Sequence, residues 1–261
     1  MEVENIARNL LVAERTKKSI EPITTRFPAL SKEDAYRIQL LQIEEKLKAG
    51  MTVVGKKIGL TSQAMQEMMG VNEPDYGHLL DSMMCIDGVV LSLDHFLQPK
   101  LESEIAFVLK KDVKGPGVTA LDIVKATDYV VPAFELIDSR IAGWNITFED
   151  TVADNGSSAR AILGGVPTQL EGMDLAHLGM NVYKNGKLID HATGAAVMGN
   201  PLEAVAWLAN ALSQFDKCLL KGEIILSGAL AKAVSVQAGD TFMAEFAHLG
   251  AVEVSFTEGD D

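Results

Sequence analysis

Residues Leu101 to Leu109 read LESEIAFVL, a run in which two glutamates are set among residues typical of a buried strand. Side chains of a strand point to opposite faces in turn, so Glu102 and Glu104 share one face. The apolar run that follows them indicates that one end of the strand lies far from water. Two adjacent carboxylates in such a place need a cation, because burial and like charge both oppose their ionisation.

The composition limits the class of protein. A chain of 261 residues with 48% hydrophobic residues is long enough for one large domain with its own core. The formal net charge of -13 argues against a nucleic-acid or anionic-membrane partner. Cys85 and Cys218 form no closely spaced pair, so neither a zinc site nor a disulfide framework is expected. With no leader-like N-terminus and no apolar run that could span a bilayer, we expect a cytoplasmic protein.

The pattern of elements changes near residue 50. Before it, Ser31 with Asp34 resembles a helix start, apolar residues recur at helical spacing to Leu47, and Gly50 is placed to end the helix. After it, short β-type runs alternate with turn signals such as Asn185-Gly186, and helices are few, the clearest beginning at Asn200-Pro201. The sequence therefore predicts an α+β fold, with an N-terminal helical arm (1–50) and a β-rich catalytic domain (51–261).

A third acid joins the first two as a candidate metal ligand. Glu135 lies between Phe134 and Leu136 in the apolar run DYVVPAFELID, where a solvated position is not expected. Three carboxylates that converge from two strands suit a hard divalent cation such as Mg²⁺ or Mn²⁺, with positions left open for water and substrate oxygens. The alternative is that Glu102, Glu104 and Glu135 are separate surface acids on half-exposed strands.

Two further residues are candidates for catalysis. Lys57 has glycines at positions 55 and 59, so we expect its face of the strand to leave room for a ligand; the alternative is a solvated lysine at a strand end. Asp75 lies between Pro74 and a nearby glycine in EPDYG, which suits a fixed loop that presents one carboxylate, although an ordinary turn aspartate has the same pattern. His78, beside this loop, is the one histidine of interest.

The stretch GPGVTA, residues 115–120, imitates a dinucleotide-binding fingerprint. Pro116 sits in its turn, and Thr119 with Asp122 explains the helix start as a capping box. The surrounding chain does not alternate strands with helices, so we reject a dinucleotide site.

Several long blocks together resemble a known family. The sequence is similar to the 2-hydroxypenta-2,4-dienoate hydratase group of the fumarylacetoacetate hydrolase superfamily over essentially its whole length, through GKKIGLTSQAM, GVNEPDYGHLLDSM, LQPKLESEIAFVL, VVPAFELIDSRI, DTVADNGSS, ILSGAL and AGDTF. The resemblance implies a mixed β-roll or sandwich fold with packed helices, commonly in homo-oligomers. It also implies that Glu102, Glu104 and Glu135 bind Mg²⁺ or Mn²⁺, and that Lys57 and Asp75 belong to the active site.

The same resemblance implies a reaction in the meta-cleavage catabolism of aromatic compounds. A 2-hydroxy-2,4-dienoate would be converted to its 2-oxo enone, and water would add at C4 to give a 4-hydroxy-2-oxo acid. A homo-oligomer, associated with a partner enzyme of the same pathway, is the expected assembly. The length of the substrate, pentadienoate or heptenedioate, stays open.

Two other functions stay open. The 4-oxalocrotonate decarboxylases of the superfamily are similar and tend to have KMG and PIYG where this chain has KIG and PDYG, which favours hydration because the Asp75 carboxylate can assist water. The block SSARAILGG, however, is nearer to the decarboxylase pattern. A non-enzymatic protein with a structural cation is the third interpretation, and the glycine-flanked Lys57 argues against it.

Overall fold

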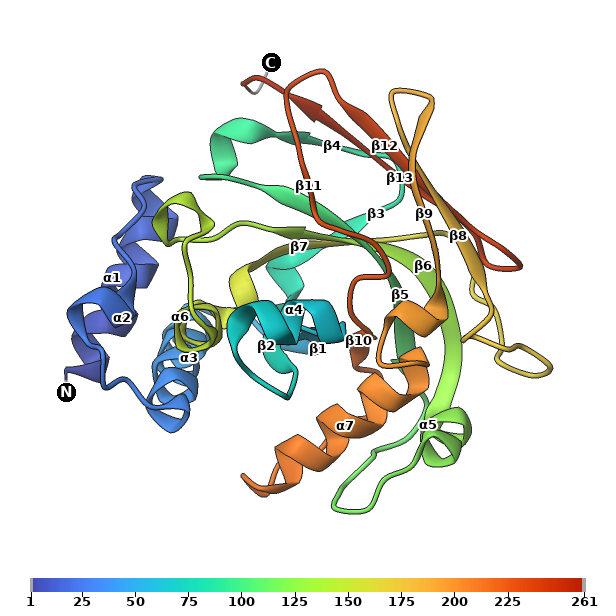
Figure 1. Ribbon diagram of the computed structural model, residues 1–261, viewed down its shortest axis with the longest axis horizontal. Coiled ribbons are helices and arrows are strands. Elements are labelled where there is room, and N and C mark those ends of the chain that lie inside the picture. Colours follow the sequence, from blue (N-terminus) through green and yellow to red (C-terminus); the bar gives the residue numbers. More distant parts are fainter. Residues whose placement is uncertain (1, 260–261) are drawn as a thin grey trace.

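The computed structural model describes residues 2–259 and has two β-sheets surrounded by helices (Figure 1). The helices are α1 Val3–Thr16, α2 Ile23–Arg26, α3 Lys32–Lys48, α4 Gln63–Met69, α5 Ala120–Ala126, α6 Phe148–Ala153 and α7 Pro201–Ser213. The strands are β1 Val53–Gly59, β2 Asp75–Leu80, β3 Met84–Ile86, β4 Val89–Ser92, β5 Lys100–Leu109, β6 Thr127–Ile137, β7 Ser158–Leu163, β8 Gly179–Lys184, β9 Lys187–Thr193, β10 Ile224–Leu226, β11 Val234–Ser235, β12 Thr241–Phe246 and β13 Gly250–Thr257. The α+β prediction is confirmed.

The larger sheet has eight strands in the order β2-β1-β10-β5-β6-β7-β3, with β11 paired to β5. The sheet is rolled, because β2 contacts β7 although β1, β10, β5 and β6 lie between them in the strand order. Its inner face carries a small apolar cluster of side chains from five strands: Leu79, Ala106, Val131, Ala133, Ala161 and Leu226. These side chains therefore fill one end of the interior of the roll.

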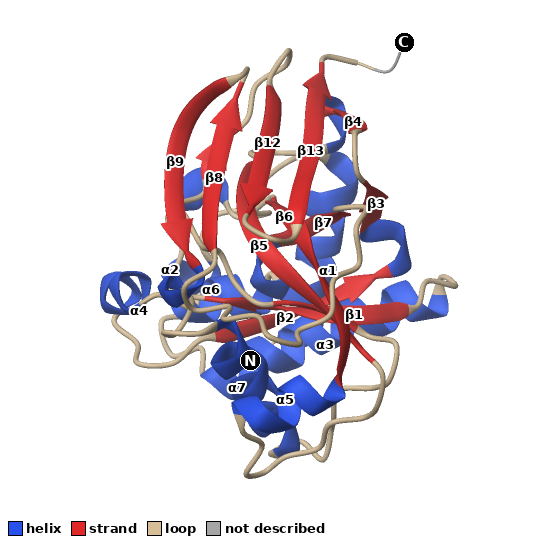
Figure 2. Ribbon diagram, turned by 90° about the vertical axis from the view of Figure 1, so that its right-hand side faces the viewer, coloured by secondary structure: helices blue, strands red, loops and turns tan. Residues whose placement is uncertain are grey.

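The second sheet has the order β4-β13-β12-β8-β9 and packs on the outer face of the rolled sheet. Its strands stand side by side in Figure 2, with most of the helices gathered below them. Phe242 and Phe256 meet edge to face within this sheet and belong to the same large core as Phe134 of β6. This arrangement matches the mixed roll or sandwich expected from the sequence.

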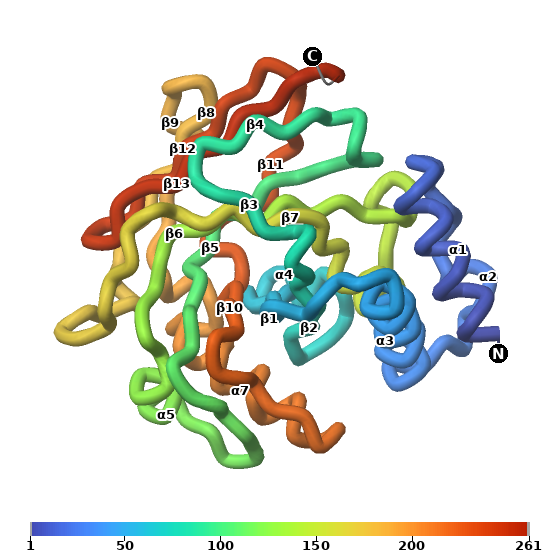
Figure 3. The backbone as a smooth tube through the Cα atoms, turned by 180° about the vertical axis from the view of Figure 1, so that it is seen from behind, coloured from blue at the N-terminus to red at the C-terminus, as the bar shows by residue number. Residues whose placement is uncertain are grey.

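The N-terminal helices α1 to α3 lie on the side of the molecule opposite β8 and β9 (Figure 3). Their buried side chains belong to the main core, and Gln39 of α3 donates hydrogen bonds to the carbonyls of Tyr76 and Val152. Gln42 donates likewise to the carbonyl of Ala153. Residues 2–50 thus pack directly against β2 and α6, which lie next to the site described below. No helix within residues 2–259 is both long and apolar enough to cross a membrane.

The local signals in the sequence have clear structural outcomes. Ser31 caps α3 by accepting from the N–H of Asp34, and α3 ends at Lys48, just before Gly50. Asn185 and Gly186 both have positive φ and join β8 to β9, as the hairpin signal predicts. The capping box at Thr119 and the Asn200 cap are also confirmed. The expected apolar helix face was wrong at Leu47, which is exposed, because the buried face of α3 turns away from it.

Candidate metal centre and active site

The three predicted acidic ligands converge on the inner face of the rolled sheet. Glu102 and Glu104 share that face of β5, and the pairing of β5 with β6 sets Glu135 directly opposite Glu102. One carboxylate oxygen from each of the three lies within 4.8 Å of those of the other two. Glu104 and Glu135 are fully buried and Glu102 is partly exposed, so the alternative of separate surface acids is wrong.

Lys57 and Asp75 extend this cluster across the roll. Lys57 of β1 is buried, and its Nζ lies 3.0 Å from Oε2 of Glu135. Asp75 is also buried and is paired with Gly59, two residues beyond Lys57 on the same face of β1. All five predicted site residues thus meet on one face of one sheet, although they come from four strands.

Two details of the sequence interpretation need correction. The glycines that flank Lys57 do not leave room for a ligand: a Cβ at Gly55 would lie 1.9 Å from the carbonyl oxygen of Ile224, and one at Gly59 would lie 2.1 Å from Oδ1 of Asp75. Glycine is needed there because neighbouring protein atoms fill the space. Asp75 is the first residue of β2 and not part of a loop.

His78 is not part of the cluster. It is paired with Lys56, so it points to the opposite face of the sheet from Lys57. Its Nδ1 lies 2.9 Å from Oε1 of Gln39, and burial lowers its pKa to about 4. On the same face Lys56 forms a buried ion pair with Glu223, at 2.6 Å. This second polar network braces β1 and β2 from the outer side of the roll.

The charges of the cluster do not balance. Four carboxyl groups face one ammonium group, that of Lys57. Burial and the charges of Glu135 and Glu102 hold the pKa of Glu104 well above its ordinary value. Burial, with the charge of Glu135, likewise raises the pKa of Glu102 to about 7 against the opposing effect of Lys57. The site thus holds an excess of negative charge that a cation would relieve.

The ammonium of Lys57 is kept charged. Burial alone would lower the pKa of Lys57, but the carboxylates of Glu135, Asp75, Glu102 and Glu104 raise it above its ordinary value. Burial also raises the pKa of Asp75, although Lys57 and hydrogen bonds from Gly59 and Thr151 act in the opposite direction. A protonated lysine therefore lies beside carboxyl groups that ionise less readily than usual, which is the arrangement needed for proton transfer.

The donor set fits a hard divalent cation. Oε2 of Glu104 accepts a hydrogen bond from the N–H of Gly228 at 2.7 Å, but Oε1 of Glu104 and Oε1 of Glu135 have no hydrogen-bond partner although both are buried. Buried carboxylate oxygens without partners are costly unless something else coordinates them. Mg²⁺ and Mn²⁺ are bound by such oxygen ligands, whereas zinc and copper prefer nitrogen and sulfur.

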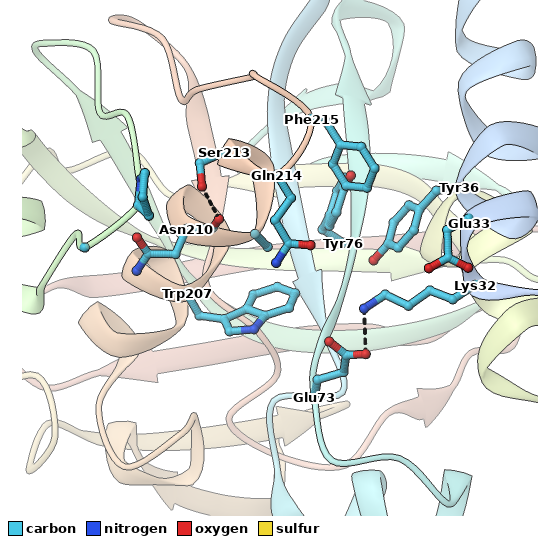
Figure 4. A pocket seen from close by; sticks show the side chains of 13 residues that line it. Lys32, Glu33, Tyr36, Glu73, Tyr76, Trp207, Asn210, Ser213, Gln214 and Phe215 are labelled. Carbon is cyan, nitrogen blue, oxygen red and sulfur yellow. Dashed lines mark hydrogen bonds and ion pairs between the residues drawn. The ribbon is translucent and has the colours of Figure 1, made fainter.

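A separate cavity of about 380 Å³ lies between α3, α7 and the segment before β2 (Figure 4). Tyr76 lines it and stacks on Tyr36, with ring centroids 4.6 Å apart, and Lys32 pairs with Glu73 at its edge. Tyr76 follows Asp75 in β2, so the two side chains point to opposite faces. None of the five predicted site residues lines this cavity, which is therefore distinct from the acid cluster.

The sequence interpretation missed the turn 154–157, which covers Lys57. A Cβ at Gly156 would lie 2.6 Å from Cε of Lys57, and Asn155 bonds both main-chain polar groups of His78, at 2.8 and 3.0 Å. The signal was available in the run DNGSS, in which an Asn-Gly pair indicates a tight turn. Nothing in the local pattern, however, showed that this turn would pack on Lys57.

The rolled sheet brings together three carboxylates of the kind that can hold a hard divalent cation. The chain belongs to the fumarylacetoacetate hydrolase family, since the family described as Fumarylacetoacetate (FAA) hydrolase C-terminal matches residues 65–257.

Full-length relatives in this family are hydratases, which are hydro-lyases. The chain is 44% identical over 258 residues to 2-hydroxyhexa-2,4-dienoate hydratase of Comamonas testosteroni, with 98% of each chain covered. It is 44% identical over 253 residues to 2-keto-4-pentenoate hydratase of Paraburkholderia xenovorans (strain LB400), covering 97% of this chain and 94% of the relative. Among solved structures, 4-oxalocrotonate decarboxylase from Pseudomonas putida G7, complexed with magnesium and adipate, has a TM-score of 0.95 at 38% identity and covers 98% of this chain and 97% of its own.

Proposed function

We propose that this protein is a metal-dependent hydratase that adds water to a 2-hydroxy-2,4-dienoate, through its 2-oxo enone tautomer, to give a 4-hydroxy-2-oxo acid. The observation that carries the proposal is the convergence of three carboxylates beside a buried, charged lysine. The similarity to full-length dienoate and pentenoate hydratases supports the substrate class. A structural cation alone would not explain the buried Lys57 and Asp75 beside it.

In this proposal Glu102, Glu104 and Glu135 hold Mg²⁺ or Mn²⁺. Such a cation, when bound, supplies Lewis-acid stabilisation of the negative charge that develops on the 2-oxygen of the substrate. The protein's own contribution is to exclude water from that position, because Glu104 and Glu135 lie at a fully buried point of the roll.

Lys57 and Asp75 carry the proton transfers in this proposal. Lys57 is held as an ammonium by its carboxylate neighbours, so it can donate a hydrogen bond to an oxygen of the substrate or a proton to its chain. Oδ1 of Asp75 is buried and has no hydrogen-bond partner, so it is free to accept a proton from the attacking water. Loss of the 2-hydroxyl proton together with protonation at C5 gives the conjugated enone. The oxygen of water then adds at C4, its released proton goes to a base such as Asp75, and C3 takes up a proton.

One assay tests the proposal against its alternatives. The protein, first stripped with EDTA, is incubated with Mg²⁺ or Mn²⁺ and either 2-hydroxypentadienoate or 4-oxalocrotonate, and ultraviolet absorbance and CO₂ release are followed. We expect metal-dependent loss of the dienoate without CO₂. Release of CO₂ from 4-oxalocrotonate would instead select a decarboxylase, the second candidate, which the close structural similarity to 4-oxalocrotonate decarboxylase favours. Inertness toward both substrates would support a structural cation.

Substitutions test the residue roles within this proposal. Glu104→Gln is expected to abolish metal-dependent turnover, and Lys57→Ala to lower kcat by at least about 100-fold, within the range typical of a general acid or base. Full turnover by Lys57→Ala would remove the lysine from the mechanism. The exposed Lys187 of β9 offers a control, since Lys187→Ala removes the same charge far from the site and should leave kcat unchanged.

The remaining parts of the proposal concern organisation. We take residues 1–50 as a helical arm and residues 51–261 as the catalytic domain, in a cytoplasmic homo-oligomer that associates with a partner enzyme of its pathway. Light scattering after size-exclusion chromatography would measure the oligomer, and a single species with the mass of one chain would contradict that part. We also place the proposed activity in the catabolism of aromatic compounds.

A further inference from the structure

The turn that covers Lys57 has an unusual backbone. Asn155, Gly156 and Ser157 all have positive φ, at 55°, 59° and 57°, and together they form the short 3₁₀ segment between α6 and β7. Two of the three are not glycine, and residues with side chains rarely adopt this backbone conformation. Such strain persists only where the surroundings fix it, and it gathers at functional sites.

The surroundings fix this turn from both ends. Asp154 is fully buried and binds the guanidinium of Arg140, with Oδ1 2.6 Å from Nε and Oδ2 3.0 Å from the main-chain N. Asn155 binds the main chain of His78 as both donor and acceptor. The carbonyl of Ser157 accepts from the N–H of Asp138, the residue directly after the strand that carries Glu135. The turn is thereby tied to β2 and to the end of β6.

This turn lies directly against the side chain of Lys57. The space where a Gly156 side chain would begin lies 2.6 Å from Cε, 3.2 Å from Cδ and 3.4 Å from Nζ of Lys57. On the facing strand, a Cβ at Gly77, the residue paired with Lys57, would lie 2.4 Å from the carbonyl oxygen of Asn155. The turn therefore limits the side chain of Lys57 on one side, and its Nζ lies 3.0 Å from Oε2 of Glu135.

We infer that Gly156 and Asn155 are positioning residues that fix the ammonium of Lys57 on Glu135 and so aim it at the reacting atoms. Gly156 forms the wall against which the lysine stem lies, and Asn155 holds that wall on β2. The inference rests on the proposed function for its catalytic consequence, but the contact between the turn and Lys57 does not depend on it. Neither residue touches the substrate in this account; both act through Lys57.

Gly156→Ala tests the inference, with Gly172→Ala as the matched control. Gly172 has a similar positive φ of 73° but no atom within 4 Å of its Cβ position, so its variant carries the backbone cost without the contact. We expect Gly156→Ala to lower kcat by about 100-fold, as a misplacement of about 1 Å can do, with KM changed less than about threefold. Gly172→Ala should keep the wild-type kcat.

A double-mutant cycle separates positioning from general damage. In a Lys57→Met background, Gly156→Ala is expected to change neither the residual kcat nor the dissociation constant for Mg²⁺, measured by calorimetry without substrate. In the protein that keeps Lys57, Gly156→Ala should change the dissociation constant for Mg²⁺ at least about threefold, because it moves the ammonium beside Glu135. Equal effects in both backgrounds, or an effect no larger than that of Gly172→Ala, would overturn the inference.

A milder variant covers the case in which Gly156→Ala does not fold. Asn155→Gly removes both hydrogen bonds to His78 and adds no backbone strain, so the turn should fold but lose its attachment to β2. We expect a loss in kcat of about tenfold that disappears in the Lys57→Met background, and a loss that persists there would overturn the inference. The Mg²⁺ titrations need no turnover, so they decide this inference even if the wild-type protein proves inert toward both dienoates.

Discussion

Replacing Glu102 by glutamine should make the metal-free protein more stable while weakening its metal site. In the folded protein the pKa of Glu102 is about 7, against an ordinary value of 4.5. A group whose folded pKa is raised loses stability as pH rises from its unfolded to its folded pKa, because the unfolded chain ionises first. Below pH 4.5 the two states do not differ, and above pH 7 the cost is complete.

The size of the effect follows from the two pKa values. Each unit of difference between the folded and unfolded pKa is worth about 1.4 kcal/mol. Ionised Glu102 therefore lowers the stability of the metal-free protein at pH 8 by at most about 3 kcal/mol. Glu102 is partly exposed, and solvent screening reduces this figure to about 1–3 kcal/mol. At pH 5 the same arithmetic leaves less than about 1 kcal/mol.

Metal should remove most or all of this difference in stability. At a Mg²⁺ concentration of 100 times its dissociation constant, the wild-type protein gains about 2.7 kcal/mol. Loss of groups that merely orient metal ligands already weakens binding by about 10–100-fold, so loss of a ligand should weaken it at least about 100-fold. Under the same conditions Glu102→Gln would then gain only about 0.4 kcal/mol.

Urea unfolding at 25 °C measures all of these quantities. Wild-type, Glu102→Gln and Glu253→Gln proteins are compared at pH 8 and pH 5, in EDTA and in excess Mg²⁺. Glu253 is exposed on β13, so its variant loses one charge without touching the cluster and should match the wild type. A Glu102→Gln protein less stable than wild type in EDTA at pH 8, or equally stabilised by Mg²⁺, would refute the electrostatic account of the site.

Three further predictions concern the same site and its supports. Asp154→Asn deprives the buried guanidinium of Arg140 of its carboxylate, and it should cost about 3–5 kcal/mol in the free energy of unfolding; a loss below about 1 kcal/mol in urea would contradict this. The pKa of His78 is lowered from 6.5 to about 4 in the folded protein, so His78 does not reduce the stability of the fold above pH 6.5. At pH 5 the histidine is protonated in the unfolded chain but not in the folded protein, which should remove about 2 kcal/mol of stability. His78→Gln should flatten that acid-side loss in thermal unfolding curves, and an unchanged pH profile would count against it. Finally, Mg²⁺ binding should release protons from Glu102, whose pKa is about 7, so calorimetric enthalpies should depend more strongly on the ionisation heat of the buffer at pH 6 than at pH 9.

The acid pair on β5 shows what local sequence can predict. Alternation along a strand is enough to place Glu102 and Glu104 on one face, and the structure confirms it. It cannot place Glu135 opposite Glu102, because that register depends on how β5 pairs with a strand about thirty residues away. The resemblance to a family supplied what alternation could not, since it implied that the three glutamates bind one cation.

Lys57 shows the opposite case, in which a residue that does lie in the acid cluster was chosen for a wrong reason. Its flanking glycines indicated open space, yet that space is filled by the main chain of β10 and by the carboxylate of Asp75. β10 comes about 170 residues later in the chain and is inserted between β1 and β5. No local pattern near Lys57 indicates which distant strand will approach it, so the contact was not predictable from the sequence alone.

The apolar end of the roll constrains how this protein can diverge from its relatives. Beneath the carboxylates the inner face is closed by Ala106, Ala133 and Ala161, all fully buried. Alanine can be shortened only to glycine, so mutation at these three positions can free very little space. Adaptation to acids with longer or bulkier tails should therefore accumulate at other positions, and these three alanines should stay the same while those positions change.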